Sequence, residues 1–178
     1  EVSQTTPYLH EALTGVYKLD VSPTIAVDNW NEIESPRFND FWSQNIKIQG
    51  LKAQNGTYNG EDYRYVIYKK VVLYPQKTGK LKLEPLSLDV SMRVPTNRRD
   101  IFGSRLMTRV NRTISAGSKT INVKNLPEAG KPNDFSGAVG DFDFNVFTSK
   151  RVLDASESLQ LKVEVRGNGN LKLFKLPK

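Results

Sequence analysis

The chain has 178 residues, a formal net charge of +7 from 26 basic and 19 acidic residues, and no cysteine. This length allows one or two domains with a proper hydrophobic core. The lack of cysteine excludes disulfides, thiolate metal sites and cysteine nucleophiles. The single histidine, His10, is expected in an exposed turn, so catalytic triads and multi-histidine metal sites find little support. We therefore expect no enzyme, no metal site and no cofactor.

The first third of the chain predicts a strand followed by less regular segments. Apolar residues alternate with polar ones over residues 13–21, which is typical of a half-buried strand. Residues 22–45 contain two prolines and lose this alternation, so we expect a long connection with one short strand. Residues 46–54 predict another short strand.

The stretch from Tyr63 to Val94 predicts a β-hairpin. Its first arm is dense in Tyr, Val and Ile, and residues 75–80 (PQKTGK) supply a turn. In the second arm the apolar positions change phase by one residue at Glu84-Pro85. Because such a slip turns side chains to the opposite face, we expect a bulge or a change of sheet there.

Residues 95–119 form a basic segment with a single acidic residue, Asp100. We expect it to be irregular, with at most a turn or two of helix over 98–112, and to be followed by a closing strand over 118–123. Arginine pairs well with carboxylate or phosphate, so this segment is the best candidate for binding an acidic partner. Its candidate residues are Arg98, Arg99, Arg105, Arg109 and Arg112. Few aromatic side chains accompany them, and we expect no nucleic acid partner.

The last part of the chain predicts a linker and more strands. Residues 126–140 are rich in proline and glycine, which is typical of a linker. Strands are expected around 142–146 and 159–165, then a turn at 167–170 (GNGN) and a strand starting in 171–176 (LKLFKL). The near absence of helical periodicity favours antiparallel β-sandwiches.

An internal repeat supports a tandem organisation. A shift of 146 residues places Glu11, Leu13 and Leu19 over Glu157, Leu159 and Val165. We therefore expect tandem Ig-like antiparallel β-sandwich modules, the second truncated. The expected boundaries are 1–125 for the first module, with its leading strand before Glu1, 126–140 for the linker, and 141–178 for the beginning of the second.

Two further patterns have alternative interpretations. Trp30 and Trp42 could stack on sugar rings, which would make the chain a carbohydrate-binding module, or they could pack in the sandwich. Asp154-Ala155-Ser156-Glu157-Ser158 matches the D-x-S-x-S cation motif of von Willebrand factor A domains. Its place before a strand favours a polar turn.

Three segments resemble the BatD oxygen-tolerance proteins of Bacteroides and related bacteria: KKVVLYPQKTGKLKLEPLSLDV, LPEAGKPNDFSGAVGDFDF and GNGNLKLFKLP. In that family a strand ends in a P-x-K-x-G turn before an L-x-L-x-P-L strand, and an F-S-G-A-V-G-x-F segment opens the next domain. The resemblance covers the chain from about residue 8 to residue 178, and the F-S-G-A-V-G-x-F segment is its most specific part.

The resemblance implies an exported, periplasmic or extracytoplasmic protein with tandem Ig-like domains between a signal peptide and a C-terminal membrane anchor, both outside this chain. It also implies partner proteins with von Willebrand factor A domains and a role in aerotolerance, and it supplies no catalytic residues. We expect a non-enzymatic scaffold of a membrane-associated aerotolerance complex. We also expect exposed sheet edges in 142–177 to allow a homodimer.

Overall fold

The computed structural model describes residues 1–175, and its regular elements are eleven β-strands. Every ladder between these strands is antiparallel, which confirms the predicted all-β, antiparallel fold. The strands are β1 (Leu13–Val21), β2 (Ala26–Glu34), β3 (Phe41–Ile46), β4 (Gln54–Tyr58), β5 (Glu61–Pro75), β6 (Gly79–Leu83), β7 (Ser87–Arg99), β8 (Arg105–Ser115), β9 (Lys119–Val123), β10 (Gly140–Thr148) and β11 (Leu161–Gly169).

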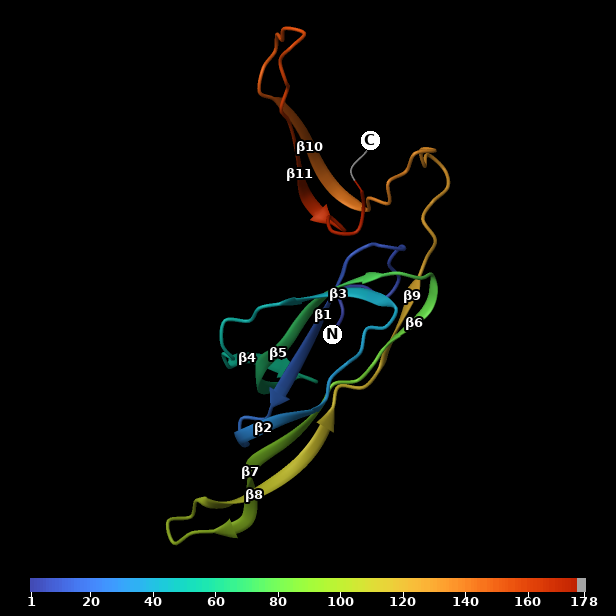
Figure 1. Cartoon of the computed structure of the whole chain (residues 1–178). Coiled ribbons are helices and arrows are strands. Elements are labelled where there is room, and N and C mark those ends of the chain that lie inside the picture. The colour runs from blue at the N-terminus through green and yellow to red at the C-terminus, as the bar shows by residue number, and fades with distance from the viewer. Residues whose placement is uncertain (176–178) are drawn as a thin grey trace.

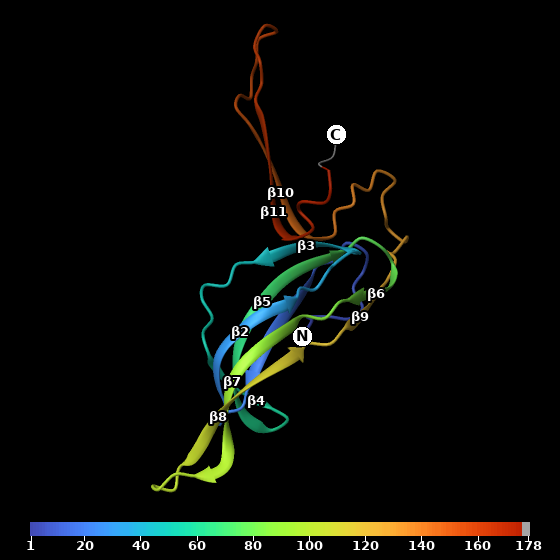
Figure 2. The same cartoon turned by 60° about the horizontal axis from the view of Figure 1, so that its bottom comes forward.

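The strands before residue 125 form a two-layered sandwich (Figure 2). In one layer β5 is central, with β1 along one side and both β3 and β4 along the other. The opposite layer consists of the β6–β9 pair and the β2–β7–β8 sheet. The first nine residues cross between the layers, because Val2 pairs with Gly15 of β1 and Tyr8 pairs with Lys124 beside β9.

Two apolar clusters fill the space between the layers. In the first, Leu13, Val71 and Leu73 pack against Leu81 and Leu83 of β6 and their neighbours on β9. The second is built around Leu86, just before β7, and around Leu88 and Val90 on β7, and Tyr17 and Tyr68 of the facing sheet cover it.

One long β-ribbon serves both clusters. Up to Pro95, the residue numbers of each pair have the same sum in the β6–β9 and β7–β8 ladders. The two ladders therefore keep one register across the interruption at residues 84–86. Leu81 and Leu83 point into the first cluster, and Leu86 and Leu88 point into the second. The predicted change of sheet at Glu84-Pro85 is confirmed, since the phase slip is how the ribbon presents an apolar face to each cluster.

The predicted hairpin over Tyr63–Val94 is wrong, because its two arms lie in different layers. Strand β5 uses both of its edges at residues 70–73, pairing with β1 on one side and β3 on the other. No edge remains there for β6, which pairs with β9 instead. Residues 76–78 therefore form an arch between the layers.

Two predictions over residues 22–54 are also wrong. The expected long connection contains two strands, β2 and β3, and most of the expected strand over 46–54 is a loop. The ladder between β2 and β7 shifts register at Val27/Asn29 and again at Glu32/Glu34. These irregularities break the alternation of buried and exposed side chains that identifies a strand in a sequence.

The basic segment is regular, and it contains no helix. Strand β7 continues to Arg99 and β8 begins at Arg105, so residues 87–115 form a β-hairpin whose far end projects beyond the sandwich (Figure 1). The prediction of an irregular segment is therefore wrong, and the closing strand predicted at 118–123 is confirmed as β9.

After residue 124 the chain runs without a strand to β10, which pairs with β11 as a separate two-stranded ribbon. The predicted turn at 167–170 is wrong, since Gly167 and Gly169 complete β11 opposite Phe142 and Gly140. Residues 171–173 form a turn where a strand was expected. The end of that expected strand, Leu176, lies outside the described residues, as does Pro177.

A hydrogen bond between the layers gives the sandwich a predicted alkaline sensitivity. Tyr68 Oη donates to Glu32 Oε2 at 2.8 Å. The pKa of Tyr68 is raised to about 12, mainly because the side chain is buried and secondly because of this hydrogen bond. Because the folded pKa exceeds the ordinary value of 10.0, the stabilisation is complete below pH 10 and is lost as pH rises toward 12. We expect the tyrosinate absorbance titration of the wild type minus that of Tyr68→Phe to show one midpoint near pH 12. A difference midpoint near pH 10 would contradict this.

Candidate interaction surfaces

The arginines of the β7–β8 hairpin divide between its two faces. Arg93 stands opposite Arg109 in the ladder, and Arg99 stands opposite Arg105. Opposed residues share a face, and residues two apart on a strand do so as well. Arg93, Arg99, Arg105 and Arg109 therefore share one face, where Asp28 of β2 binds Arg93 at 2.9 Å and Arg109 at 3.3 Å. Arg93 was not among the predicted residues, because it lies outside the run of arginines that identified the segment.

Two of the five predicted arginines belong elsewhere. Arg112 stands opposite Val90 and is on the other face of the hairpin. Arg98 lies in the irregular stretch where the ladder shifts register, between Pro95 and Arg99. Register thus brings together Arg99, Arg105 and Arg109, places Arg112 on the other face, and leaves Arg98 in the interruption of the ladder.

The two tryptophans do not form a common platform. Trp30, on β2, packs against the second apolar cluster and lines a pocket of about 190 Å³ with Leu19 and Val66. Trp42, on β3, meets Tyr74 edge to face, with ring centroids 5.5 Å apart. The predicted pair of binding aromatics is therefore split between the two layers.

The β10–β11 ribbon is amphipathic. The opposed pairs Phe144/Val165, Val146/Val163 and Thr148/Leu161 define one face, and the pairs Asp143/Arg166, Asn145/Glu164 and Phe147/Lys162 define the other. On the first face, Phe144, Val146 and Leu161 are half exposed. An apolar sheet face of this kind is usually buried against a second layer.

Hydrogen bonds at the start of β11 repeat those at the start of β1. Five hydrogen bonds at the start of β1 have a counterpart in which both residues lie 146 positions later. The strand pairing of Val2 with Gly15 likewise has a counterpart 146 positions later, between Thr148 and Leu161. The first set joins Ser3 with Thr14 twice, Tyr8 with Glu11 twice, and Gln4 with Glu11. The second set joins Ser149 with Gln160 twice, Asp154 with Glu157 twice, and Lys150 with Glu157. Glu157 of the D-x-S-x-S segment therefore closes a turn, as Glu11 does.

Asn170 connects two segments that carry the family resemblance. Its buried amide accepts a hydrogen bond from Val139 N and donates one to Gly137 O, each 2.8 Å long. The F-S-G-A-V-G segment is thereby fixed to the end of β11. Tyr74 Oη, on β5, donates to Gly169 O at 2.9 Å and so joins this corner to the sandwich.

Several of the remaining polar groups of residues 1–175 are engaged in local ion pairs and turns. A cleft of about 630 Å³ is lined by Lys18, Glu1 and Tyr65, but Lys18 forms an ion pair with Glu1 at 2.8 Å, and this bond lowers the pKa of Glu1. His10 lies in a turn with φ 63° and is partly buried, where an exposed residue was expected. Over residues 1–175 no group of three or more His, Asp or Glu is placed to hold a metal ion. In the same range no helix is long and apolar enough to cross a bilayer.

Comparisons with family models, curated proteins and solved structures give no match to this chain.

Proposed function

We propose that this chain is a non-enzymatic interaction module of an exported, membrane-associated aerotolerance complex of the BatD type. The family assignment rests on the sequence segments described above. The observation that carries the interaction role is the half-exposed apolar face of the β10–β11 ribbon, centred on Val146 and Val163. This face is the binding surface that we assign to a partner protein.

The repeated hydrogen bonds support this role. A shift of 146 residues relates β1 to the start of β11, and it places buried Leu13 and Leu19 over Leu159 and Val165. The first copy of this pattern is covered by a facing β-layer, whereas Val163 in the second is exposed. We infer that the two copies begin tandem Ig-like modules and that the apolar face of the second copy is an interface, as the corresponding face of the first copy is.

The family resemblance suggests a protein with a von Willebrand factor A domain as that partner. Binding to such a purified partner tests the proposal. Val146→Asp puts a charge on the apolar face, where burial without a counter-charge is unfavourable, and should weaken binding at least about tenfold. The neighbouring Asn145→Asp changes the polar face and should leave binding unchanged.

Sedimentation velocity on the isolated chain distinguishes an interface between two copies of this chain from an interface with a different protein. Self-association that Val146→Asp abolishes would identify a second copy as the occupant and would overturn the assignment to a von Willebrand factor A partner. Equal binding by both variants would remove the ribbon face from the interface.

The alternative, carbohydrate binding, has less support. Its motivation was a platform shared by Trp30 and Trp42, and these residues lie in different layers.

A further inference from the structure

We propose that the tip of the β7–β8 hairpin binds a lipid bilayer with anionic headgroups. The tip carries two large apolar side chains, Ile101 and Phe102, which are 93% and 87% exposed. Single exposed apolar residues are common on protein surfaces. Two in succession at the end of a projecting hairpin, flanked by arginines, form a more specific arrangement.

Hydrogen bonds hold the tip in one conformation. The Asp100 carboxylate accepts from the backbone amides of Phe102 and Ser104, at 2.9 Å each. Gly103 N donates to Asp100 O, and the Arg99 guanidinium donates to Gly103 O. This network presents Ile101 and Phe102 to solvent in a fixed geometry. The entropy cost of ordering the tip is then largely met before any partner binds.

The charge around the tip is complementary to an anionic surface. Residues 87–115 contain six arginines and two aspartates. The Asp100 carboxylate is occupied by backbone amides, and Asp28 of β2 partly neutralises Arg93 and Arg109. Arg98, Arg99 and Arg105, which directly flank Ile101 and Phe102, have no acidic partner among the described ion pairs. Each arginine close to an anionic bilayer strengthens binding about fivefold.

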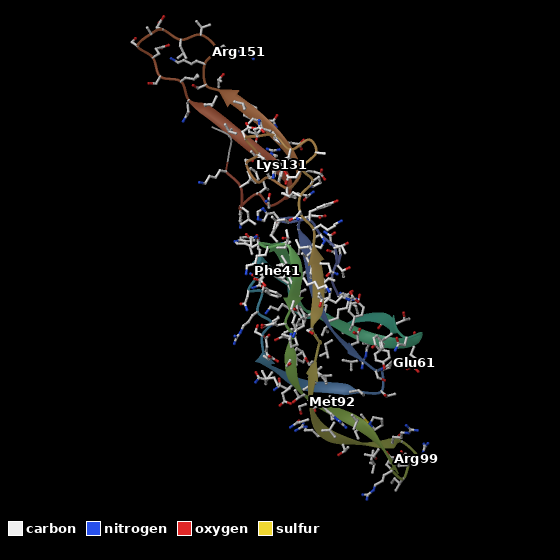
Figure 3. All side chains as sticks on the ribbon, turned by 90° about the vertical axis from the view of Figure 1, so that its right-hand side faces the viewer. Phe41, Glu61, Met92, Arg99, Lys131 and Arg151 are labelled. Carbon is white, nitrogen blue, oxygen red and sulfur yellow. The ribbon has the colours of Figure 1, made fainter. Side chains whose placement is uncertain are left out.

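The position of the hairpin gives it access to an extended surface. The tip marked by Arg99 lies at one end of the elongated molecule, and the loop marked by Arg151 lies at the other (Figure 3). A planar bilayer can therefore meet Ile101 and Phe102 without contacting the sandwich. A convex tip with apolar side chains between arginines suits the boundary between headgroups and acyl chains.

Sedimentation with phosphatidylcholine vesicles, with and without phosphatidylserine, tests the proposal. We expect binding to the phosphatidylserine vesicles alone. Ile101→Ser/Phe102→Ser should weaken it at least about tenfold, and replacing Arg98, Arg99 and Arg105 with Gln should weaken it about 100-fold. Val152→Ser, at an 85% exposed apolar residue in the β10–β11 loop, should bind as the wild type does.

A site-specific label reports whether the tip enters the bilayer. Because the chain has no cysteine, Ile101→Cys and Val152→Cys each provide one site for a polarity-sensitive fluorophore. The fluorescence should shift to the blue with phosphatidylserine vesicles at position 101 and stay unchanged at position 152. Absence of binding, or binding that the Ile101→Ser/Phe102→Ser variant retains, would overturn the proposal. Arginine-dependent binding without a shift at position 101 would also overturn it, because the apolar tip would then take no part in binding.

Discussion

Leu73→Ala should lower the free energy of unfolding of the sandwich by about 3 kcal/mol, within the range seen when a buried leucine is truncated. Leu73 is fully buried on the central strand, opposite Leu13 of β1, in the cluster that joins the two layers. Strand pairing on both sides of β5 restricts how far the backbone can close the cavity. The loss is a large part of the roughly 5–15 kcal/mol that is typical of a domain.

Denaturant unfolding followed by tryptophan fluorescence measures this loss, since Trp30 and Trp42 lie one in each layer. The matched control is Leu106→Ala, which removes the same atoms from a partly exposed residue on β8 and should change stability by about 0.5 kcal/mol or less. If both variants unfolded at the wild-type midpoint, the assignment of Leu73 to the stabilising core would be wrong.

Gly167→Ala should disrupt the β10–β11 ribbon while leaving the sandwich folded. Gly167 has φ 150°, a backbone conformation that residues with a Cβ rarely adopt. A Cβ at this position would overlap the carbonyl oxygen of Asp141 and lie 2.9 Å from Phe142 Cα, on the paired strand. Backbone atoms in a ladder cannot move aside as a flexible side chain can. Strain of this kind costs about 1–3 kcal/mol before the clash is counted.

Amide hydrogen exchange measures the protection of the β10–β11 ribbon and of the sandwich separately. Protection of residues 140–148 should fall strongly in Gly167→Ala, and protection of β5 should stay as in the wild type. Asn168→Ala is the matched control, because its side chain is exposed and its backbone needs no positive φ. A ribbon that stays protected in Gly167→Ala would mean that strand β11 has another register.

The alternation of apolar and polar residues along the sequence predicted the strands that are buried on one face. Strand β1 follows its apolar pattern from Leu13 to Leu19, and the phase slip at Glu84-Pro85 correctly marked a change of sheet. These features depend on single side chains and their immediate neighbours, which a sequence displays directly.

Pairing between distant strands could not be predicted in the same way. Residues on β5 and β6 have the pattern of a hairpin, and the arch between them arises because β1 and β3 occupy both edges of β5. The β7–β8 hairpin was missed for another reason. Its outer part is exposed on both faces and lacks the apolar alternation that signals a strand.

The candidate surfaces were predictable in composition and not in geometry. The sequence showed a run of arginines, but only the ladder register reveals that Arg99, Arg105 and Arg109 share a face and that Arg93 joins them. For the β10–β11 segment, the sequence predicted exposed strand edges. The structure adds the exposed apolar face around Val146.

The β6–β9 and β7–β8 ladders form one ribbon of constant register, and this also has a mechanical consequence. If the hairpin tip were held at a surface and the connection after β9 were pulled, the force would run lengthwise through β8 and β9. Both strands are already extended, so their covalent backbone would carry the load. The perpendicular hydrogen bonds to β7 and β6 would keep them in place, because no shift in register interrupts the two ladders between Pro95 and Gly79. The sandwich is thus suited to carry tension between its two ends.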